Sequence, residues 1–313
     1  MSGLAPVARV ASGASKVVTM RDAIARFVHD GDTVVIEGFT HLICFAAGHE
    51  IIRQKRRDLV LCRLTPDLIV DQLIAAGCAR KLVFSWAGNP GVGSLHAFRR
   101  AVESGNPPLE IEEYSHFGMV ARFSAGAAHL PFWPLRDYQG TDLPASNPRI
   151  AQVTCPFTGE QLAAVPALNP DVTIVHAQRA DAQGNTQIWG LLGVQKEAAF
   201  ASKHVIVVVE ELVDTSVVRG DPNRTLIPGM IVDAVVVEPW GAHPSYAQGH
   251  YDRDNDFYVA WEVISRDQAS LEKYLDAHVM GVDDRAGYLA LHPGLTERLA
   301  ARAMKCEGVN YGY

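Results

Sequence analysis

Short apolar runs that alternate with helical stretches are the feature that most constrains the fold of this 313-residue chain. The run 205–209 reads Val-Ile-Val-Val-Val and shows none of the polar alternation of a half-exposed strand. Strands of this kind are covered by helices on both faces. Because strands separated by helices pair in parallel through right-handed crossovers, the sequence predicts an α/β fold. It is an open, mostly parallel sheet with helices on both faces.

Eight runs are rich in β-branched residues and too short for helices, and they lie at 33–36, 59–62, 82–84, 109–111, 150–153, 172–175, 205–209 and 231–237. Helices are predicted at 19–28, 46–54, 66–76, 94–104 and 118–128, and C-terminal packing or interface helices follow from about 265, at 267–279 and 296–304. The breaks rich in Pro and Gly are short enough to be loops rather than domain linkers. We therefore expect a mobile N-terminal arm at 1–18 and a single α/β domain at 19–313.

The charge and hydropathy of the chain exclude several classes of partner. Its 28 Lys and Arg residues against 35 Asp and Glu residues give a net charge of -7, whereas nucleic acids and anionic membranes attract basic faces. Its apolar runs are far shorter than the roughly 20 residues of a membrane helix. Its five cysteines show no CxxC pair or disulfide framework spacing. We expect a cytoplasmic protein that binds neither nucleic acid nor membrane.

The segment after the first predicted strand is the first candidate binding site. In an open parallel sheet, ligands bind beyond the carboxyl ends of the strands, and this strand exits into Glu37, Gly38, Phe39, Thr40 and His41. Glycine at 38 permits a close backbone approach that leaves N–H groups free to hold an oxyanion. The alternative is a plain strand-to-helix turn with Phe39 in the core. We predict substrate binding by Gly38, Phe39 and Thr40.

The third strand exits into a loop at 88–94 that contains three glycines and a proline and opens a helix with Ser94 as its expected N-cap. The loop is neither a GxGxxG fingerprint nor a P-loop. Such a loop can cradle a carboxylate or a phosphate at the helix N-terminus, although the same composition serves any tight loop. Gly91, Gly93 and Ser94 are therefore candidates for substrate binding.

The fourth strand exits into Glu112, Glu113, Tyr114 and Ser115. Neighbouring side chains on a strand point to opposite faces, so at most one of the two glutamates faces a cleft. If that residue is Glu113, partial burial would suit it to proton transfer, and Ser115 would bind substrate beside it. The alternative is an exposed acidic strand end. The chain has no HExxH, clustered metal-ligand spacing or GxSxG elbow, so no metal site is predicted.

Taken in order, these pieces resemble the alpha subunits of family I CoA transferases, above all the branch that contains the alpha-type chain of glutaconate CoA-transferase. The resemblance runs from about 19 to 266. It rests on the pairs Asp30-Gly31 and Gly38-Phe39, and on the segments 34–36, 88–93, 112–115, 169–176, 180–185 and 209–211.

The resemblance implies a CoA-transferase alpha-subunit fold and an enzyme that is active only with a beta-type partner subunit. In this family a glutamate of the beta-type subunit forms a mixed anhydride with the donor acid and then carries CoA as an enzyme thioester. A carboxylate is a weak nucleophile and needs a preorganised, shielded site. This chain would supply the acyl-binding wall and part of the oxyanion site. Acyl-CoA and carboxylic acids would be the substrates, with no permanently bound cofactor.

One departure from the family pattern concerns the loop after the first strand. The pattern has two glycines before the phenylalanine and a Gly and a Pro farther on, where this chain carries Glu37, Ile43 and Phe45. The loop is therefore rebuilt, and the resemblance does not define the acyl group. Two other functions stay open. One is a hydrolase or C–C bond lyase that acts on a cyclic acyl-CoA with Glu113 as base, and the other is a non-catalytic binding subunit.

Overall fold

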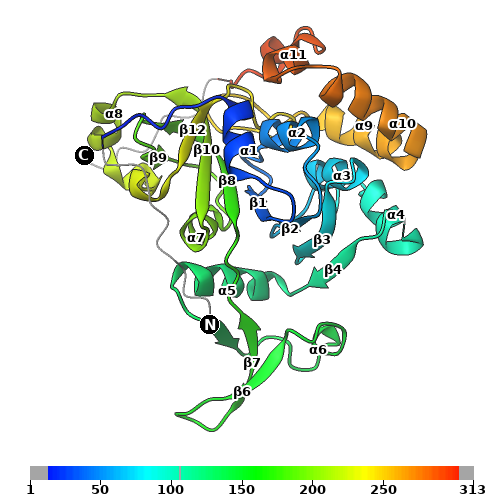
Figure 1. Ribbon diagram of the computed structural model, residues 1–313, viewed down its shortest axis with the longest axis vertical. Coiled ribbons are helices and arrows are strands. Elements are labelled where there is room, and N and C mark those ends of the chain that lie inside the picture. Colours follow the sequence, from blue (N-terminus) through cyan, green and yellow to red (C-terminus); the bar gives the residue numbers. More distant parts are fainter. Residues whose placement is uncertain (1–12, 106, 303–313) are drawn as a thin grey trace.

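The computed structural model describes residues 13–105 and 107–302. Its larger sheet has nine strands (Figure 1). They are β1 (Thr33–Glu37), β2 (Leu59–Cys62), β3 (Ala79–Phe84), β4 (Glu110–Glu113), β8 (Val172–Ala180), β9 (Thr186–Gln187), β10 (His204–Leu212), β11 (Thr225–Ile227) and β12 (Ala234–Val237). The strand order is β12-β10-β8-β1-β2-β3-β4, with parallel pairing throughout this path, and β9 and β11 add antiparallel pairs beside β8. The predicted mostly parallel sheet is confirmed.

Twelve α-helices are described, with three single-turn segments between or after them. The helices are α1 (Met20–Phe27), α2 (Phe45–Arg53), α3 (Leu68–Ala75), α4 (His96–Ser104), α5 (His116–Ala127), α6 (Leu143–Ser146), α7 (Gln195–Ala201), α8 (Thr215–Gly220), α9 (Asn255–Arg266), α10 (Gln268–Leu275), α11 (Arg285–Ala290) and α12 (Leu295–Leu299). The single-turn segments are η1 (Pro222–Arg224), η2 (Gly229–Ile231) and the π-helical η3 (Asp276–Met280). No helix in 13–105 or 107–302 is long and apolar enough to cross a membrane.

Helices cover both faces of the sheet, as the unalternating strands predict. On β1, Val34 and Ile36 pack in one buried cluster with α1, α2 and α3, whereas Val35 packs in another with residues of α5 and α7. On β10, Ile206 and Val208 belong to the first of these clusters, and Val205, Val207 and Val209 belong to a third cluster. Each strand therefore buries apolar side chains on two sides.

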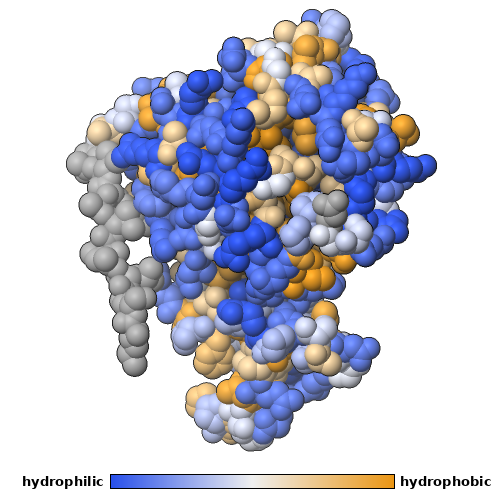
Figure 2. Space-filling view, turned by 45° about the vertical axis from the view of Figure 1, so that its right-hand side comes forward, coloured by the Kyte–Doolittle hydropathy of each residue, from blue (hydrophilic) through white to orange (hydrophobic). Residues whose placement is uncertain are grey.

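A smaller antiparallel sheet projects below the main sheet in Figure 1 and contains β5 (Phe132–Leu135), β7 (Gln161–Pro166) and β6 (Ala151–Thr154), in that order. The strand predicted at 150–153 is β6, so this run lies outside the parallel sheet. Strands β5 and β7 were not predicted, because each contains a proline that weakens a strand pattern. Hydrophilic residues cover most of the face in Figure 2, and hydrophobic residues gather in smaller groups, some of them on this projecting part.

Other boundaries differ from expectation. Ser94 is not the cap of its helix, because α4 begins at His96 with Leu95 at the N-cap position. The run 231–237 begins in η2, and its strand is β12. Of the N-terminal arm expected at 1–18, residues 1–12 lie outside the described part of the chain, while Val18 donates a backbone hydrogen bond to Val235 on β12 at 2.9 Å. Met304, the expected end of the last helix, also lies outside the described residues.

Candidate functional site

The carboxyl ends of β1, β2, β3 and β4 meet at one edge of the sheet, because these strands are parallel neighbours (Figure 1). The segments that leave them begin at Gly38, Arg63, Ser85 and Tyr114. The segments after β1, β3 and β4 contain residues that were predicted from the sequence to bind substrate. Parallel sheets bind ligands at this edge, so it is the candidate site.

Gly38 has no room for a side chain. A Cβ atom there would lie 2.7 Å from the backbone oxygens of both His41 and Leu42. The left-handed conformations of this turn belong to its neighbours, since Thr40 has φ 56° and Leu42 has φ 55°. Gly38 is therefore required by the tight packing of the turn against its own backbone, and the approach of Gly38 to a substrate stays a prediction.

A buried ion pair between Arg63 and Asp67 hydrogen-bonds to the Gly38 peptide. Arg63 and Asp67 are each 1% exposed, and Nη1 of Arg63 lies 2.8 Å from Oδ1 of Asp67. Nη2 of Arg63 donates a hydrogen bond of 2.8 Å to the carbonyl oxygen of Gly38. In a trans peptide the N–H points opposite to the C=O. The N–H of Phe39 is thus directed away from Arg63.

His41 links the turn to two other segments as a neutral ring. Its Nδ1 lies 3.0 Å from the carbonyl oxygen of Leu191, and its Nε2 accepts a hydrogen bond of 3.0 Å from the backbone N–H of Gln248. The ring must therefore carry its proton on Nδ1. Burial lowers the pKa of His41 to about 4, which keeps the ring neutral at pH 7.

Glu37 ends β1 as a fully buried carboxyl group. Its Oε2 lies 3.5 Å from the backbone nitrogen of Leu64, whereas its Oε1 has no hydrogen-bond partner within the described part of the chain. A Cβ atom on Gly193 would lie 3.2 Å from Oε1, so the carboxyl lies directly against that glycine. Burial raises the pKa of Glu37 to about 7, although the nearby Arg63 opposes the shift.

Phe39 is half-buried and lies against His116, the first residue of α5, with ring centroids 5.8 Å apart. Nδ1 of His116 lies 3.0 Å from Oγ of Ser85, and Ser85 donates its own proton to the carbonyl of Leu64 at 2.6 Å. Nδ1 of His116 must then be the donor to Ser85. Segments after β1, β2, β3 and β4 thus meet around one imidazole ring.

The side chain of Ser115 caps helix α5. Its Oγ caps α5 by accepting a hydrogen bond of 2.9 Å from the N–H of Gly118, and it also donates to Asp137. Its backbone N–H donates to the hydroxyl of Tyr138 at 3.1 Å. These contacts fix the start of α5 beside His116. Binding of substrate by Ser115 stays a prediction.

The glycine loop at 88–94 holds an anion from its own chain. Oε2 of Glu262, on α9, accepts a hydrogen bond of 3.1 Å from the backbone N–H of Ser94. A Cβ atom on Gly93 would lie 2.3 Å from the same oxygen. Gly91 has φ 74° and open space around it. Glu262 of the chain itself thus lies against the loop at Gly93 and Ser94, and binding of substrate by Gly91, Gly93 and Ser94 stays a prediction.

Of the two neighbouring glutamates on β4, Glu112 is buried and Glu113 is exposed. Lys81 and Arg122 lie 2.6 and 2.7 Å from the carboxylate of Glu112, which explains why its pKa is lowered despite burial. The two side chains therefore differ in environment, as the strand geometry predicts. Glu113 lacks the partial burial on which its proposed role as a base depends.

No group of three or more His, Cys, Asp or Glu side chains in 13–105 and 107–302 is arranged to hold a metal ion. Arg63, Ser85 and His116 contribute to the site although the sequence did not single them out. They stand singly after their strands, and no spacing marks them. Their position directly after parallel strands was the available signal.

Residues 17–238 match the coenzyme A transferase family. The chain belongs to this family. It is 55% identical over 277 residues to the A-type chain of 3-oxoadipate CoA-transferase from Pseudomonas knackmussii, covering 88% of this chain and 98% of that protein. The crystal structure of glutaconate coenzyme A-transferase from Acidaminococcus fermentans matches with a TM-score of 0.86 and 34% identity, over 92% of this chain and 96% of that chain. The predicted family, its branch and its fold are confirmed.

A more distant relative bears on the alternative function. The chain is 27% identical over 284 residues to the cholesterol ring-cleaving hydrolase IpdA subunit of Mycobacterium tuberculosis, covering 86% of this chain and 94% of that protein. The transferase relatives are the more similar ones.

The buried carboxyl of Glu37 makes a pH-dependent contribution to stability. Its pKa is about 7 in the folded chain against 4.5 as the ordinary value, so the folded state binds the extra proton between these pH values. Stability from this group is therefore full below pH 4.5 and is lost as the pH rises to 7, by about 3 kcal/mol. The isosteric Glu37→Gln variant cannot ionise, so it should gain stability relative to wild type as the pH rises.

Urea unfolding at pH 5 and pH 8 measures this difference. The control is Glu103→Gln, which removes a carboxylate from an exposed position and is measured at the same two pH values. An equal difference for Glu37→Gln at the two pH values would show that the carboxyl is already ionised in the folded state at pH 5.

Proposed function

We propose that this chain is the A-type subunit of a heteromeric CoA-transferase and that a beta-type subunit completes its site. The observation that carries the proposal is the 55% identity to the A-type chain of 3-oxoadipate CoA-transferase across 98% of that protein. We propose the same substrate class, a six-carbon 3-oxo dicarboxylic acid with an acyl-CoA as CoA donor. The CoA thioester is then a substrate, and no permanently bound cofactor takes part.

In this proposal the chain supplies the acyl-binding wall and part of the oxyanion site. Arg63 orients the Gly38 carbonyl, which supports the N–H of Phe39 as a donor to the oxyanion. The ring of Phe39 and the adjacent Thr40 would contact the acyl chain. The glutamate nucleophile would come from the partner subunit.

The remaining candidates have different support. Gly91 lies in open space and can still approach a substrate with its backbone. Gly93 and Ser94 lie against Glu262. We therefore propose that they shape the loop, and that only the side of the loop facing away from Glu262 contacts substrate. Ser115 would act by holding the start of α5, which carries His116.

We further propose that residues 19–313 form one domain in a cytoplasmic protein. One buried cluster joins Val35 of β1 and Val83 of β3 to Leu135 and Val165 of the smaller sheet, which supports a common core. The net charge of -7 supports the absence of nucleic acid and membrane from the partners.

The alternative functions receive less support. A hydrolase or C–C bond lyase with Glu113 as base would need that carboxyl to be shielded, but its side chain is exposed. No observation favours a non-catalytic binding subunit.

A CoA-exchange assay on the complex of this chain with a beta-type subunit tests the proposal. We expect transfer to 3-oxoadipate with a kcat/KM at least about 10-fold above that for glutaconate. Glutaconate is one carbon shorter, lacks the 3-oxo group and carries a C=C bond, so it leaves contacts of the site unmade. Acetoacetate and adipate separate the contributions of the 3-oxo group and the distal carboxylate. Absence of transfer to all four acids, or release of free CoA without transfer, would contradict the proposal.

The Gly38→Val variant tests the role of the turn. Its Cβ would collide with two backbone oxygens, so the turn must move and the oxyanion donor with it. Loss of one such donor typically costs about 10²–10³-fold in kcat, and we expect a loss of that size in the assembled complex. Gly220→Val is the control, because a Cβ atom there meets no atom within 4 Å. Normal turnover of Gly38→Val would show that the turn is merely structural.

A further inference from the structure

Residues after position 238, where the match to the family model ends, contact the candidate site. The match to the family ends at 238, yet the segment 240–248 lies against the turn after β1. Oγ of Ser245 donates to the carbonyl of Thr40 at 2.9 Å. The N–H of Leu42 donates to the carbonyl of Tyr246 at 2.9 Å, and the N–H of Gln248 donates to His41 at 3.0 Å. Three consecutive residues of the turn are thus hydrogen-bonded to the segment 240–248.

This turn needs external support. Thr40 and Leu42 both have left-handed backbone conformations, at φ 56° and φ 55°. Residues with side chains hold such conformations at a cost in free energy, and they persist where the surroundings over-determine them. The hydrogen bonds from the segment 240–248 are contacts of this kind.

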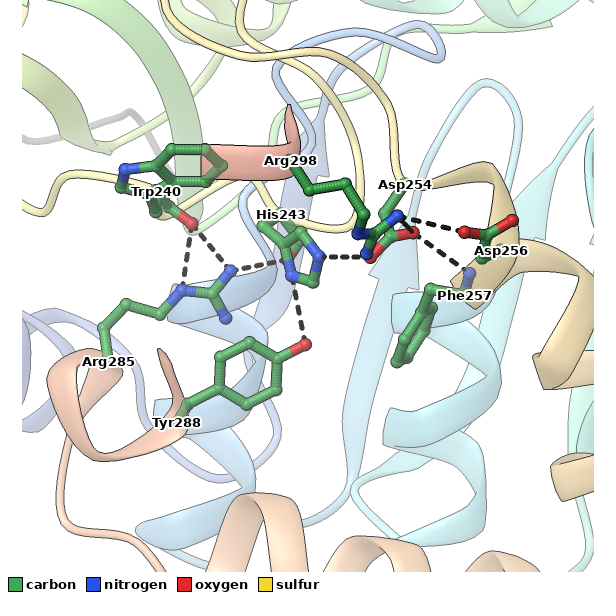
Figure 3. Close-up of polar contacts among 8 residues, drawn as sticks. All are labelled: Trp240, His243, Asp254, Asp256, Phe257, Arg285, Tyr288 and Arg298. Carbon is green, nitrogen blue, oxygen red and sulfur yellow. Dashed lines mark hydrogen bonds and ion pairs between the residues drawn. The ribbon is translucent and has the colours of Figure 1, made fainter. Parts of the chain in front are cut away.

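Arg285 donates hydrogen bonds to two residues of the segment 240–248 (Figure 3). This arginine is the first residue of α11 and is 2% exposed. Its Nε and Nη2 donate to the carbonyl of Trp240 at 2.9 and 2.6 Å, and Nη2 also donates to the carbonyl of His243 at 2.6 Å. One guanidinium group therefore satisfies two carbonyl oxygens of the same buried bend.

The ring of His243 ties this bend to two more elements (Figure 3). Its Nε2 lies 2.9 Å from the carboxylate of Asp254, and its Nδ1 lies 3.1 Å from the hydroxyl of Tyr288. Asp254 in turn pairs with Arg298 at 2.9 Å. Burial lowers the pKa of His243 to about 4, so the ring donates to Asp254 and accepts from Tyr288. Hydrogen bonds to Arg285, Asp254 and Tyr288 therefore fix the bend.

We propose that Arg285 is a positioning residue for CoA transfer, acting through the segment 240–248 on the Thr40–Leu42 turn. The proposal rests on the proposed function, because the turn is placed there in the acyl-binding wall. Arg285 touches no reacting atom. It fixes the backbone of the segment 240–248, which in turn fixes the Thr40–Leu42 turn, so the C-terminal helix α11 contributes to positioning at the candidate site.

Three variants in the assembled complex test the chain of contacts. Arg285→Met keeps the aliphatic stem and removes the guanidinium, and Ser245→Ala removes the hydroxyl contact to Thr40. Arg100→Met is the control, because Arg100 donates to the carbonyls of Ser265 and Arg266 near the end of α9 and does not touch the segment 240–248.

For Arg285→Met we expect kcat to fall about 10- to 100-fold with KM within about 2-fold, since small displacements of a positioned group cost this much in rate. Arg285→Lys should restore part of the loss. Ser245→Ala should lower kcat less, and in the double variant its effect should be non-additive, because both act on one segment. Arg100→Met should leave kcat unchanged.

Hydrogen exchange provides a readout independent of activity. The amide of Leu42 is bonded to Tyr246, so a peptide covering 40–46 should exchange faster in Arg285→Met and at the wild-type rate in Arg100→Met. Equal exchange in both variants, equal kcat losses in both, or additive effects of Arg285→Met and Ser245→Ala would overturn the proposal. A wild-type complex without transfer activity but with this exchange pattern would contradict the proposed function, and only the structural link between Arg285 and the Thr40–Leu42 turn would stand.

If Arg285→Met does not fold, Tyr288→Phe replaces it. This variant removes the hydroxyl bonded to His243 and keeps the ring. It should raise exchange in 40–46 and lower kcat in the same direction. Wild-type exchange and wild-type kcat in Tyr288→Phe would then overturn the proposal.

Discussion

The backbone turn that follows β1 is the constraint on which the rest of the site depends. Gly38 leaves no space for a side chain between itself and the carbonyls of His41 and Leu42. The buried Arg63 donates a hydrogen bond to the Gly38 carbonyl, and the segment 240–248 makes hydrogen bonds to Thr40 and Leu42. A backbone fixed on both sides can present an N–H group in one direction without reorganising, which is what stabilisation of an oxyanion requires.

The charged groups around the turn are paired or have their ionisation weakened by burial. Arg63 is neutralised by Asp67, and the second carboxyl nearby, Glu37, has a pKa raised to about 7 by burial. His41 is neutral, and Glu262 lies against the loop at Gly93 and Ser94. The chain thus offers shape and hydrogen-bond donors at this edge, which suits a protein whose partner brings the reacting carboxylate.

The features that the sequence predicted well are those with a local or periodic cause. The unalternating run at 205–209 predicted burial on both faces, and the two neighbouring glutamates on β4 do lie in different environments. In each case one physical rule links the residues to the outcome.

The features that it missed depend on contacts between distant residues. Arg63 follows its strand as a single residue, and its partner atom is the carbonyl of Gly38. The pairing of Glu262 with the loop at 88–94 joins segments more than 160 residues apart. Helix α9 was not predicted, because its aromatic and β-branched residues also favour strands, and the burial of Trp261 against Asp71 appears only in the folded chain.

In the proposed function this chain shapes the site while its partner carries the nucleophile. Intact-mass analysis of the complex after incubation with acyl-CoA, on wild type and on Glu113→Gln, separates the two roles. We expect a CoA adduct on the partner chain, none on this chain, and survival of the adduct in Glu113→Gln with a modest loss of turnover. Wild type without any adduct, together with a loss of turnover of about 10²–10⁴-fold in Glu113→Gln, would refute this division of roles and identify Glu113 as a general base.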